Sequence, residues 1–492
     1  MRPLPKTLEL GELKSADPFM GPLLSFLASR RGKEIYLVGG YLRDYFLGTT
    51  PADIDFITAG DPRELAEEAA ARLGGKAFLL HEEDGAYRVV AEGGWNGRRT
   101  IDFAPIKGMS VEEDLSYRDF TINAMALDIE RLVGGELRLP RDLVDKHYGW
   151  RDLSRGILRE CSNESFLMDP VRLVRALRFR HILGLEYEER TLNHMKKYAP
   201  LITRAPGERI AVELLETLLM PDTAPIFSDL EATGLMQHVF PHLVPLVGLE
   251  QNAYHHLDVW SHTLLALEEL DRLISDPRAV FPGHEEYITG RLEEPLQDLY
   301  PRKAFLRLAA LYHDAGKAET LSRDASGRIH FYAHQKHSRE AAVELVERLR
   351  LSRRAGDYIV GVVAGHMDIG LAMADRPTPR RIRRLLARLG DELVDVVLLS
   401  TADRYATRGP LSTPEKLERY VAFCRTLLDE HRREREMPPL IMGRDLIHEL
   451  GLEQGPFIGE ILKEVRVAQL EGALKSREDA LRFARDLVRY GD

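Results

Sequence analysis

Asp53 and Asp55 form a pair of acids with the spacing to hold a metal ion. One residue separates them in the β-type run DIDFIT, and alternate residues of a strand point to the same face. Two neighbouring carboxylates suit Mg²⁺, which prefers oxygen ligands and bridges substrate phosphates. Asp102, in the β-type run RRTIDF, is a candidate third carboxylate that could activate an attacking hydroxyl. On its own, an Asp-x-Asp pair is more often part of an exposed turn.

Two glycines precede this acidic pair. Gly39 and Gly40 follow the apolar segment EIYLV and open a helical stretch. Glycines at a strand-to-helix turn let backbone N–H groups approach a ligand closely, and a helix N-terminus favours an anion such as a triphosphate. A Gly-Gly pair alone is usually only a turn. Here the Asp-x-Asp pair follows after 12 residues in a strand–helix–strand setting, and the combination favours a nucleotide site.

A second set of residues consists of histidines and acids far apart in the sequence. Its members are His262, the adjacent pair His313 and Asp314 at the end of an apolar helical segment, and Asp403. His334 and His366 are additional candidate ligands. Imidazole and carboxylate groups together suit a transition metal. Each histidine alone would more often pack between helices, but the set resembles the HD phosphohydrolase motif. That resemblance implies a metal site and hydrolysis of 2′,3′-cyclic or 2′-phosphate ends.

The elements that must position these residues change in type along the chain. β-type segments near residues 34–40, 53–60, 87–94 and 98–106 alternate with helical ones up to about Asp128, which predicts a small α/β layer. From about Asp152 onward the apolar periodicity is almost wholly helical. The sequence therefore predicts an α/β head at residues 1–150 and a mostly α-helical body.

Composition limits the class of protein. With 492 residues, 44% apolar and 30% charged, the chain is typical of a globular protein of about three domains. No run reaches the ~18 apolar residues of a membrane helix, and the N-terminus lacks a signal-peptide pattern. Cys161 and Cys424 are too few for a disulfide scaffold or a thiolate zinc site. These features predict a cytoplasmic protein without a membrane partner and leave its oligomeric state open.

The net charge of −10 argues against a nucleic-acid partner only weakly, because charge is unevenly distributed. The segment 376–390 holds six arginines and no acid. Its apolar residues Ile382, Leu385, Leu386 and Leu389 follow helical spacing. The apolar face of this predicted helix packs against the rest of the protein. The basic face is either exposed to solvent or binds a polyanion.

Several segments together resemble one family. VGGYLRDYFLGTTPADIDFIT is similar to the head signature of class II tRNA nucleotidyltransferases and bacterial poly(A) polymerases. EEDLSYRDFTINAMALD, MDPVRLVRALRF, GERIAVELLETLL and the tail GRDLIHELGLEQG also fit, in the family's order. The resemblance implies a nucleotidyltransferase head at 1–150, a helical neck at 151–245, an HD-type domain at 246–410 and a tail at 411–492. It also implies tRNA and CTP, with ATP as a further candidate, as substrates.

The resemblance assigns roles to residues in these motifs. It implies that Asp53 and Asp55 bind Mg²⁺ and that Asp102 is the third carboxylate. It further implies that the nucleotide is bound by Gly39, Gly40, Arg43, Arg118, Asp169, Arg172, Arg175 and Arg178. Asp169 and Arg172 match the pair that reads the base. A carboxylate accepts from the exocyclic amine of cytosine or adenine and a guanidinium donates to the ring nitrogen, whereas uracil and guanine reverse this order. Met168 stands where the family usually has an acid.

The distance from Asp102 to Glu113 is only 11 positions. Family members that add CCA have a longer flexible segment here, and those that add two cytidines lack it. The sequence therefore favours CC addition to the 3′ end and acceptor arm of tRNA. Full CCA addition is the next alternative, followed by A addition or poly(A) synthesis. A phosphohydrolase whose head only binds nucleotide, or a non-catalytic RNA-binding protein, is disfavoured by the intact pair Asp53 and Asp55.

Overall fold

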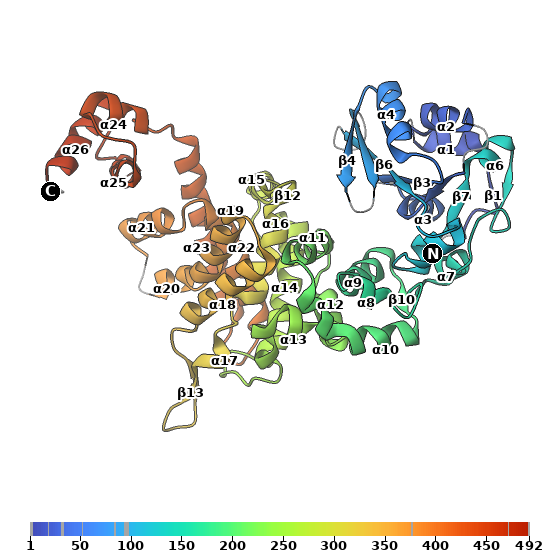
Figure 1. The fold of residues 1–492 in the computed structure, drawn as a ribbon. Helices are drawn as coiled ribbons and strands as arrows, with labels where there is room; N and C mark the ends of the chain where they lie inside the picture. The colour runs from blue at the N-terminus through green and yellow to red at the C-terminus, as the bar shows by residue number, and fades with distance from the viewer. Residues whose placement is uncertain are drawn as a thin grey trace. The chain divides into compact units, whose positions relative to one another are not determined.

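The computed structural model describes residues 3–17, 19–30, 34–51, 53–82, 85–92, 98–374, 377–470 and 472–490. They form two compact units (Figure 1). The first comprises Met1–Ala205 and Ala232–His238, and the second comprises Pro206–Glu231 and Val239–Asp492. The finer division of the chain into four domains stays a prediction.

The first unit is built around a six-stranded mixed sheet. Its strands lie in the order β4 (Lys76–His81), β5 (Ala86–Glu92), β6 (Arg98–Pro105), β3 (Asp53–Thr58), β2 (Ile35–Val38) and β7 (Ala126–Asp128). β3 and β6 are parallel, and the other neighbouring pairs are antiparallel. The four predicted strands are confirmed, although residues 93–94 lie outside the described residues. The sequence prediction omitted β4 and the three-residue β7.

The two faces of this sheet differ in polarity. Along β3, Ile54 and Phe56 are buried, whereas Asp53 and Asp55 point to the opposite face. Phe56 stacks on Phe103 of β6 with 5.4 Å between ring centroids, which joins the two parallel strands on their apolar side. The apolar face therefore anchors the strands and leaves the acidic face to carry chemistry.

Four helices of the first unit surround the acidic face and its approaches: α3 (Gly40–Leu47), α5 (Val111–Ser116), α8 (Ser165–Met168) and α9 (Arg172–Leu183). α3 begins directly after β2 and ends at Gly48, which adopts the left-handed conformation. α9 buries one apolar face, including Leu173 and Leu177, and carries its arginines on the remaining surface. The arginines of α9 thus come from a helix that is fixed by its own packing.

The second unit is almost entirely helical, as predicted. Its main helices are α11 (Gly207–Thr217), α14 (Val259–Ser275), α16 (Arg302–Tyr312), α18 (His334–Leu349), α19 (Arg353–Gly365), α22 (Leu393–Ala406) and α23 (Pro414–Glu436). Short hairpins β11–β12 (Pro295–Gln297, Tyr300–Pro301) and β13–β14 (Leu321–Arg323, Ile329–Phe331) interrupt the pattern. The last helices, α24 (Gly443–Leu450), α25 (Pro456–Leu470) and α26 (Arg477–Tyr490), share a small apolar core.

The arginine-rich segment forms α21 (Pro379–Leu389), and its predicted amphipathic character is confirmed. Leu385, Leu386 and Leu389 are buried, whereas Arg380 and Arg384 are exposed. Among the described residues, none of the helices combines the length and apolar composition that a membrane crossing needs.

Candidate functional site

The three predicted acids lie in one row across two strands. In the parallel pair of β3 and β6, Asp55 is directly opposite Asp102, and Asp53 lies two residues from Asp55 on the same face. Asp53 and Asp55 line a cavity of about 440 Å³, whereas Asp102 is not among its lining residues. The structure therefore brings two of the three acids to the cavity.

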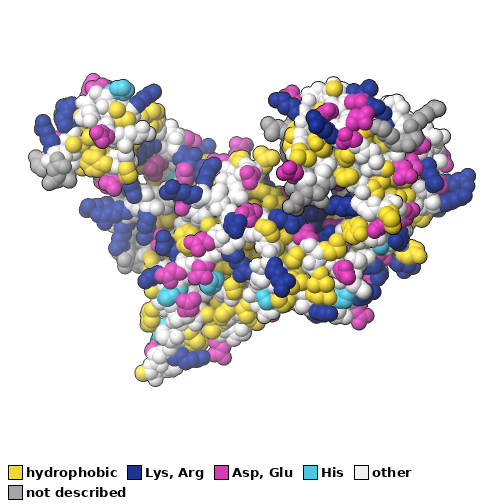
Figure 2. All heavy atoms as spheres, in the orientation of Figure 1, with side chains coloured by type: hydrophobic (Ala, Val, Ile, Leu, Met, Phe, Trp, Pro, Cys, Tyr) yellow, Lys and Arg dark blue, Asp and Glu magenta, His cyan; other side chains and the backbone are white. Residues whose placement is uncertain are grey.

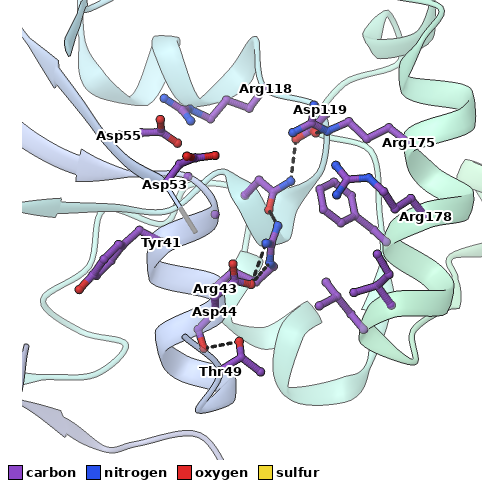
Figure 3. Close-up of a pocket in the computed structure, with 16 residues that line it drawn as sticks. Tyr41, Arg43, Asp44, Thr49, Asp53, Asp55, Arg118, Asp119, Arg175 and Arg178 are labelled. Atoms are coloured by element: carbon purple, nitrogen blue, oxygen red, sulfur yellow. Dashed lines mark hydrogen bonds and ion pairs between the residues drawn. The ribbon is translucent and has the colours of Figure 1, made fainter. Parts of the chain in front are cut away.

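The cavity has one acidic and one basic wall (Figure 3). Gly39 and Gly40 of the β2–α3 turn lie beside Asp53 and Asp55. Arg118 lies on the same side, against Gly39 and Asp55, and the opposite wall is lined by Asp119, Asn123, Arg175, Arg178 and Phe179. Carboxylates for a metal ion and guanidinium groups for phosphate oxygens thus face the same space, which is the arrangement that a nucleotide triphosphate with its cation requires.

Gly39 is required by both its conformation and its surroundings. Its φ of 77° lies in the left-handed region, which side chains rarely adopt. A Cβ at this position would lie 2.9 Å from Asp55 Oδ2 and 3.3 Å from Arg118 Nη1. The glycine therefore lets the turn pack directly against the carboxylate of Asp55.

We expect Gly39→Ala to lower the rate of nucleotide transfer by on the order of 10-fold, because the added methyl group must displace Asp55 or Arg118. Gly390→Ala is the matched control. Gly390 has a φ of 52° and a ψ of −128°, close to the 77° and −147° of Gly39, and no atom lies within 4 Å of its added Cβ. It therefore carries similar backbone strain without the collision. Steady-state kinetics and thermal unfolding of both variants separate the two effects. Equal activity losses at equal stability would contradict this explanation.

Charge at the acidic wall is poorly compensated by the protein itself. Burial raises the pKa of Asp55 to about 6, Asp102 and Asp53 add to this shift, and the Arg118 guanidinium opposes it. Burial and the neighbouring Asp102 also raise the pKa of Asp53. Carboxylates that are buried together are stabilised in their charged form by a bound cation. The donors here are all oxygens, so the site fits Mg²⁺.

A chain of polar contacts connects helix α3 to helix α9. Arg43 Nη1 donates to Asn123 Oδ1 at 2.6 Å, and Asn123 Nδ2 donates to Asp119 Oδ1 at 3.0 Å. Asp119 Oδ2 lies 2.8 Å from Arg175 Nε. Asp119 and Asn123 were not among the predicted site residues, although both lie in the second family motif. They fix the positions of Arg43 and Arg175, two of the predicted nucleotide-binding arginines.

The ring of Phe179 contacts three of the arginines that line the cavity. The guanidinium carbons of Arg43, Arg175 and Arg178 lie 4.8, 5.3 and 4.8 Å from the centre of its ring. A cation over an aromatic face is stabilised by the quadrupole of the ring. Three guanidinium groups that repel one another are thus held around one buried ring, next to the cavity.

The predicted base-reading pair is placed differently. Asp169 and Arg172 are not among the residues lining the cavity. Arg172 Nη2 donates to the carbonyl oxygen of Tyr117 at 2.7 Å, and Nη1 donates to Ser165 Oγ at 3.0 Å. Arg172 is thus fixed by the first residue of α8 and by the segment after α5, and a role of the pair in base reading stays a prediction.

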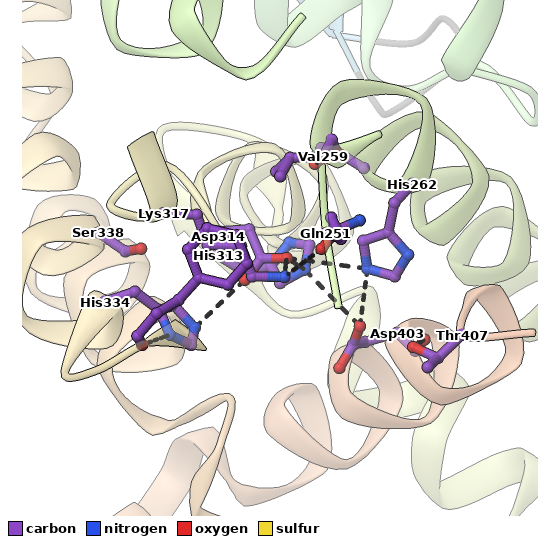
Figure 4. A network of polar contacts seen from close by, with 12 residues as sticks. Gln251, Val259, His262, His313, Asp314, Lys317, His334, Ser338, Asp403 and Thr407 are labelled. Carbon is purple, nitrogen blue, oxygen red and sulfur yellow. Dashed lines mark hydrogen bonds and ion pairs between the residues drawn. The ribbon is translucent and has the colours of Figure 1, made fainter. Parts of the chain in front are cut away.

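The second predicted cluster is assembled in the second unit (Figure 4). Two groups of three side chains each place their ligand atoms within 4.8 Å of one another: His262, His313 and Asp403, and Asp314, His334 and His366. His262 Nε2 lies 2.9 Å from Asp403 Oδ1 and 3.8 Å from Asp314 Oδ2. His334 Nε2 lies 3.3 Å from Asp314 Oδ1. All the predicted residues are therefore brought together, from α14, α18, α22 and the C-terminal ends of α16 and α19.

The imidazole rings are oriented as metal ligands usually are. Nδ1 of His313, His334 and His366 lies 2.6, 3.1 and 2.7 Å from the carbonyl oxygens of Ala310, Phe331 and Val363. When Nδ1 donates to a carbonyl, Nε2 is left as the free lone pair and points into the cluster. Burial and the neighbouring His313 lower the pKa of His366 to about 4, so its ring is neutral. This donor set fits a transition metal.

Lys317 is a further member of this cluster that the predicted set did not include. Its Nζ lies 2.6 Å from Asp314 Oδ2 and donates to Gln251 Oε1 at 2.7 Å. Lys317, Asp314 and Asp403 line a cavity of about 410 Å³. The only signal in the sequence is the position of Lys317 one turn after the His-Asp pair. An ammonium group at the edge of a metal cluster suits an anionic substrate.

Comparisons with known proteins agree with the geometry of the first unit. Residues 35–159 match the family model described as the poly A polymerase head domain. Residues 184–246 match the model described as a probable RNA and SrmB-binding site of polymerase A. A head of this class transfers nucleotides, and the row of acids on β3 and β6 lies within the matched region. The first unit therefore contains a nucleotidyltransferase head.

Similar proteins identify the family. The CC-adding tRNA nucleotidyltransferase of Thermus thermophilus is 34% identical over 459 residues, which cover 92% of this chain and 93% of the relative. The A-adding tRNA nucleotidyltransferase of Deinococcus radiodurans is 34% identical, with 91% and 94% covered. A solved CCA-adding enzyme in complex with ATP shares the fold, with a TM-score of 0.60, 22% identity, and 99% and 98% covered. The chain belongs to the tRNA nucleotidyltransferases, and the predicted fold class and enzyme class are confirmed.

Proposed function

We propose that the first unit adds cytidylate from CTP to the 3′ end of tRNA. The 3′ oxygen attacks the α-phosphorus of CTP, a phosphodiester bond forms, and the bond to the pyrophosphate oxygen breaks. The hydroxyl proton passes to a base. Bound Mg²⁺ would neutralise charge on the attacking and leaving oxygens. The observation that carries this proposal is the pair Asp53 and Asp55, which faces a cavity with a basic opposite wall.

The residues of this chain have separate tasks in the proposed reaction. Backbone N–H groups of Gly39 and Gly40, at the start of α3, approach the triphosphate. Arg43 and Arg118 supply positive charge beside it. Asp102 lies one strand away, directly opposite Asp55, and is the proposed acceptor of the hydroxyl proton.

Base selection is assigned to Asp169 and Arg172. The acid that usually precedes this Asp is replaced by Met168, whose side chain is exposed. The orientation of Arg172 is nevertheless defined, because backbone and hydroxyl oxygens of Tyr117 and Ser165 accept its hydrogen bonds. A donor held in one position favours the acceptor pattern of cytosine and leaves unpaired groups with uracil.

The segment that follows the third carboxylate supports addition of two cytidines. Lys107 N–H donates to Asp114 Oδ1 at 2.9 Å, and Met109 N–H donates to Glu113 Oε2 at 2.9 Å. Gly108 packs so closely against Glu113 that an added Cβ would collide with it. A short turn held by these contacts has no free length with which to reposition the base-reading pair for adenine. Full CCA addition and A addition are the alternatives, since relatives of each kind exist.

Basic surfaces of both units support a tRNA partner. The arginines of α9 belong to the first unit. In the second unit, Arg380, Arg383, Arg384 and Arg388 of α21 line a groove with Lys463 of α25. Figure 2 shows Lys and Arg side chains gathered on this part of the surface. Closely spaced cations of this kind bind the phosphate backbone of a nucleic acid. We assign the enzyme to the cytoplasm, which fits the scarcity of cysteine.

The transferase function is tested with a tRNA transcript that ends before CCA, incubated with one labelled nucleoside triphosphate at a time and Mg²⁺. Incorporation from CTP, with UTP and GTP at background, supports the proposal. Absence of incorporation from every nucleotide, or equal use of CTP and UTP, contradicts it.

We further propose a metal-dependent phosphohydrolase activity in the second unit. The observation that favours it is the convergence of His262, His313, Asp314 and Asp403 beside a cavity that also holds Lys317. Bound metal would polarise a phosphate ester and a water molecule. Lys317 is placed to bind a phosphate oxygen, and 2′,3′-cyclic or 2′-phosphate ends are the proposed substrates.

We expect the double variant His313→Ala, Asp314→Ala to lose the transition metal that the wild-type protein retains after dialysis, together with any phosphodiesterase activity. CTP addition should remain, because the two clusters lie in different compact units. His337→Ala is the matched control, since His337 lies one turn from His334 on α18 but pairs with Glu319 at the surface. Elemental analysis and both activity assays measure the outcome. Equal metal contents in wild-type protein and double variant would contradict the assignment.

A further inference from the structure

Arg88 of β5 holds the third carboxylate in a two-point ion pair. Arg88 Nε donates to Asp102 Oδ1 at 2.8 Å, and Nη2 donates to Asp102 Oδ2 at 2.7 Å. The two residues are directly opposite each other in the antiparallel pair of β5 and β6. Parallel hydrogen bonds between a guanidinium and a carboxylate are among the stronger polar contacts in proteins. Both oxygens of Asp102 are therefore engaged.

These two hydrogen bonds conflict with the proposed role of Asp102 as the acceptor of the hydroxyl proton. A carboxylate whose two oxygens both accept from one guanidinium is a poor acceptor for a further proton, and Asp102 does not line the cavity. The ion pair must loosen before Asp102 can reach an attacking hydroxyl. A competing anion at Arg88 would release the carboxylate.

The order of strands indicates which anion arrives there. The row of site residues runs from β2 through β3 and β6 to β5, with Gly39 at one end, Asp55 and Asp102 between, and Arg88 at the other end. The triphosphate lies at the Gly39 end. In-line displacement requires the attacking hydroxyl to approach opposite the departing pyrophosphate, which is the side of Asp102 and Arg88. The last phosphodiester of the RNA accompanies that hydroxyl.

We propose that Arg88 binds the 3′-terminal phosphodiester of the incoming RNA and thereby releases Asp102 to accept the proton of the attacking hydroxyl. The exchange replaces one charge-assisted ion pair by another of similar geometry, so it carries little net penalty. The Arg88 side chain is 34% exposed, which leaves it accessible to an RNA strand. This inference rests on the proposed transferase function and names a contact of the RNA substrate in the same site.

The test combines a change of charge in the protein with a change of charge in the RNA. Wild-type enzyme and Arg88→Met are compared on a primer whose last linkage is either a phosphodiester or an uncharged methylphosphonate, with each diastereomer resolved. We expect wild-type kcat/KM to fall about 10-fold or more on the methylphosphonate primer. Arg88→Met should lose a similar factor on the normal primer and little more on the methylphosphonate primer, because the partner of the charge is already absent.

A second variant and a control keep the result interpretable. Arg88→Gln retains hydrogen bonding to Asp102 but has no charge, and it should be as insensitive to the methylphosphonate as Arg88→Met. Arg63→Met removes an exposed arginine of α4 (Pro62–Leu73) that pairs with Glu67, and it should behave as wild type on both primers. Equal methylphosphonate penalties in wild type and both Arg88 variants would overturn the proposal. Absence of CTP addition by wild type on the normal primer would instead contradict the transferase function.

Discussion

We expect Asp55→Asn to lower CTP incorporation by at least about 10³-fold at saturating Mg²⁺, and Asp53→Asn to cause a loss of similar size. Asparagine keeps the shape of the side chain but removes a charged metal ligand. In the proposed reaction, a cation at this site stabilises the charge of the transition state by several kcal/mol. Each 1.36 kcal/mol corresponds to about a tenfold change in rate. Asp55 is the less exposed member of the pair, so water compensates less well for the loss of its charge.

Single-turnover kinetics with labelled CTP measure this loss, and filter binding measures the affinity for tRNA. Affinity should change little, since cations on the protein surface dominate contacts with the RNA backbone. Asp61→Asn is the control. Asp61 caps the N-terminus of α4 by accepting from Arg63 N–H, and asparagine caps equally well. If the turnover of Asp55→Asn were within about tenfold of the wild-type turnover, the role of Asp55 as a metal ligand would be contradicted.

The acidic row was predictable because strand periodicity alone determines it. In a run such as DIDFIT, apolar Ile54 and Phe56 must be buried, so Asp53 and Asp55 are left on the opposite face. The same reasoning applies to Asp102 between Ile101 and Phe103 on β6. The parallel register that sets Asp102 beside Asp55 follows from long-range packing, and the sequence pattern does not contain it.

Contacts that depend on register were therefore missed. The ion pair of Arg88 with Asp102 requires β5 and β6 to align residue for residue, and a shift by one position would send Arg88 to the other face. The contacts of Asn123 with Arg43 and Asp119 similarly join segments up to 80 residues apart. Asn123 lies in a 3₁₀ turn, where the periodicity of a regular element gives no direction to a side chain.

The histidine cluster shows which parts of a site can be predicted from residue types alone. Its members were identified by their similarity to a known set, although they come from five helical segments spread over residues 262–403. The carbonyl groups that orient the imidazoles could not be predicted, because Ala310 and Val363 contribute only backbone oxygens. Lys317 was not predicted to belong to the cluster, because a lysine one turn after an acid usually forms an ion pair with that acid at the protein surface.

The prediction with the greatest consequence for the biology of the enzyme concerns the product of the reaction. Given a tRNA transcript that ends before CCA, with CTP and excess ATP, the enzyme should stop after two cytidines. It should also add AMP to a transcript that already ends in CC at least about 10²-fold more slowly than it adds CMP to a transcript that lacks both. Adenine presents its amine and ring nitrogen farther from the sugar than cytosine does, so Asp169 and Arg172 would have to move.

The structure explains why that movement is opposed. Arg172 is held by oxygens of Tyr117 and Ser165, and the turn before α5 is closed by Glu113 and Asp114. A base that is misplaced by about 1 Å can lose on the order of 10²-fold in rate. Sequencing of the 3′ ends measures the product directly. A terminal adenosine from the wild-type enzyme at ordinary ATP concentrations would contradict the role of the short turn and favour full CCA addition.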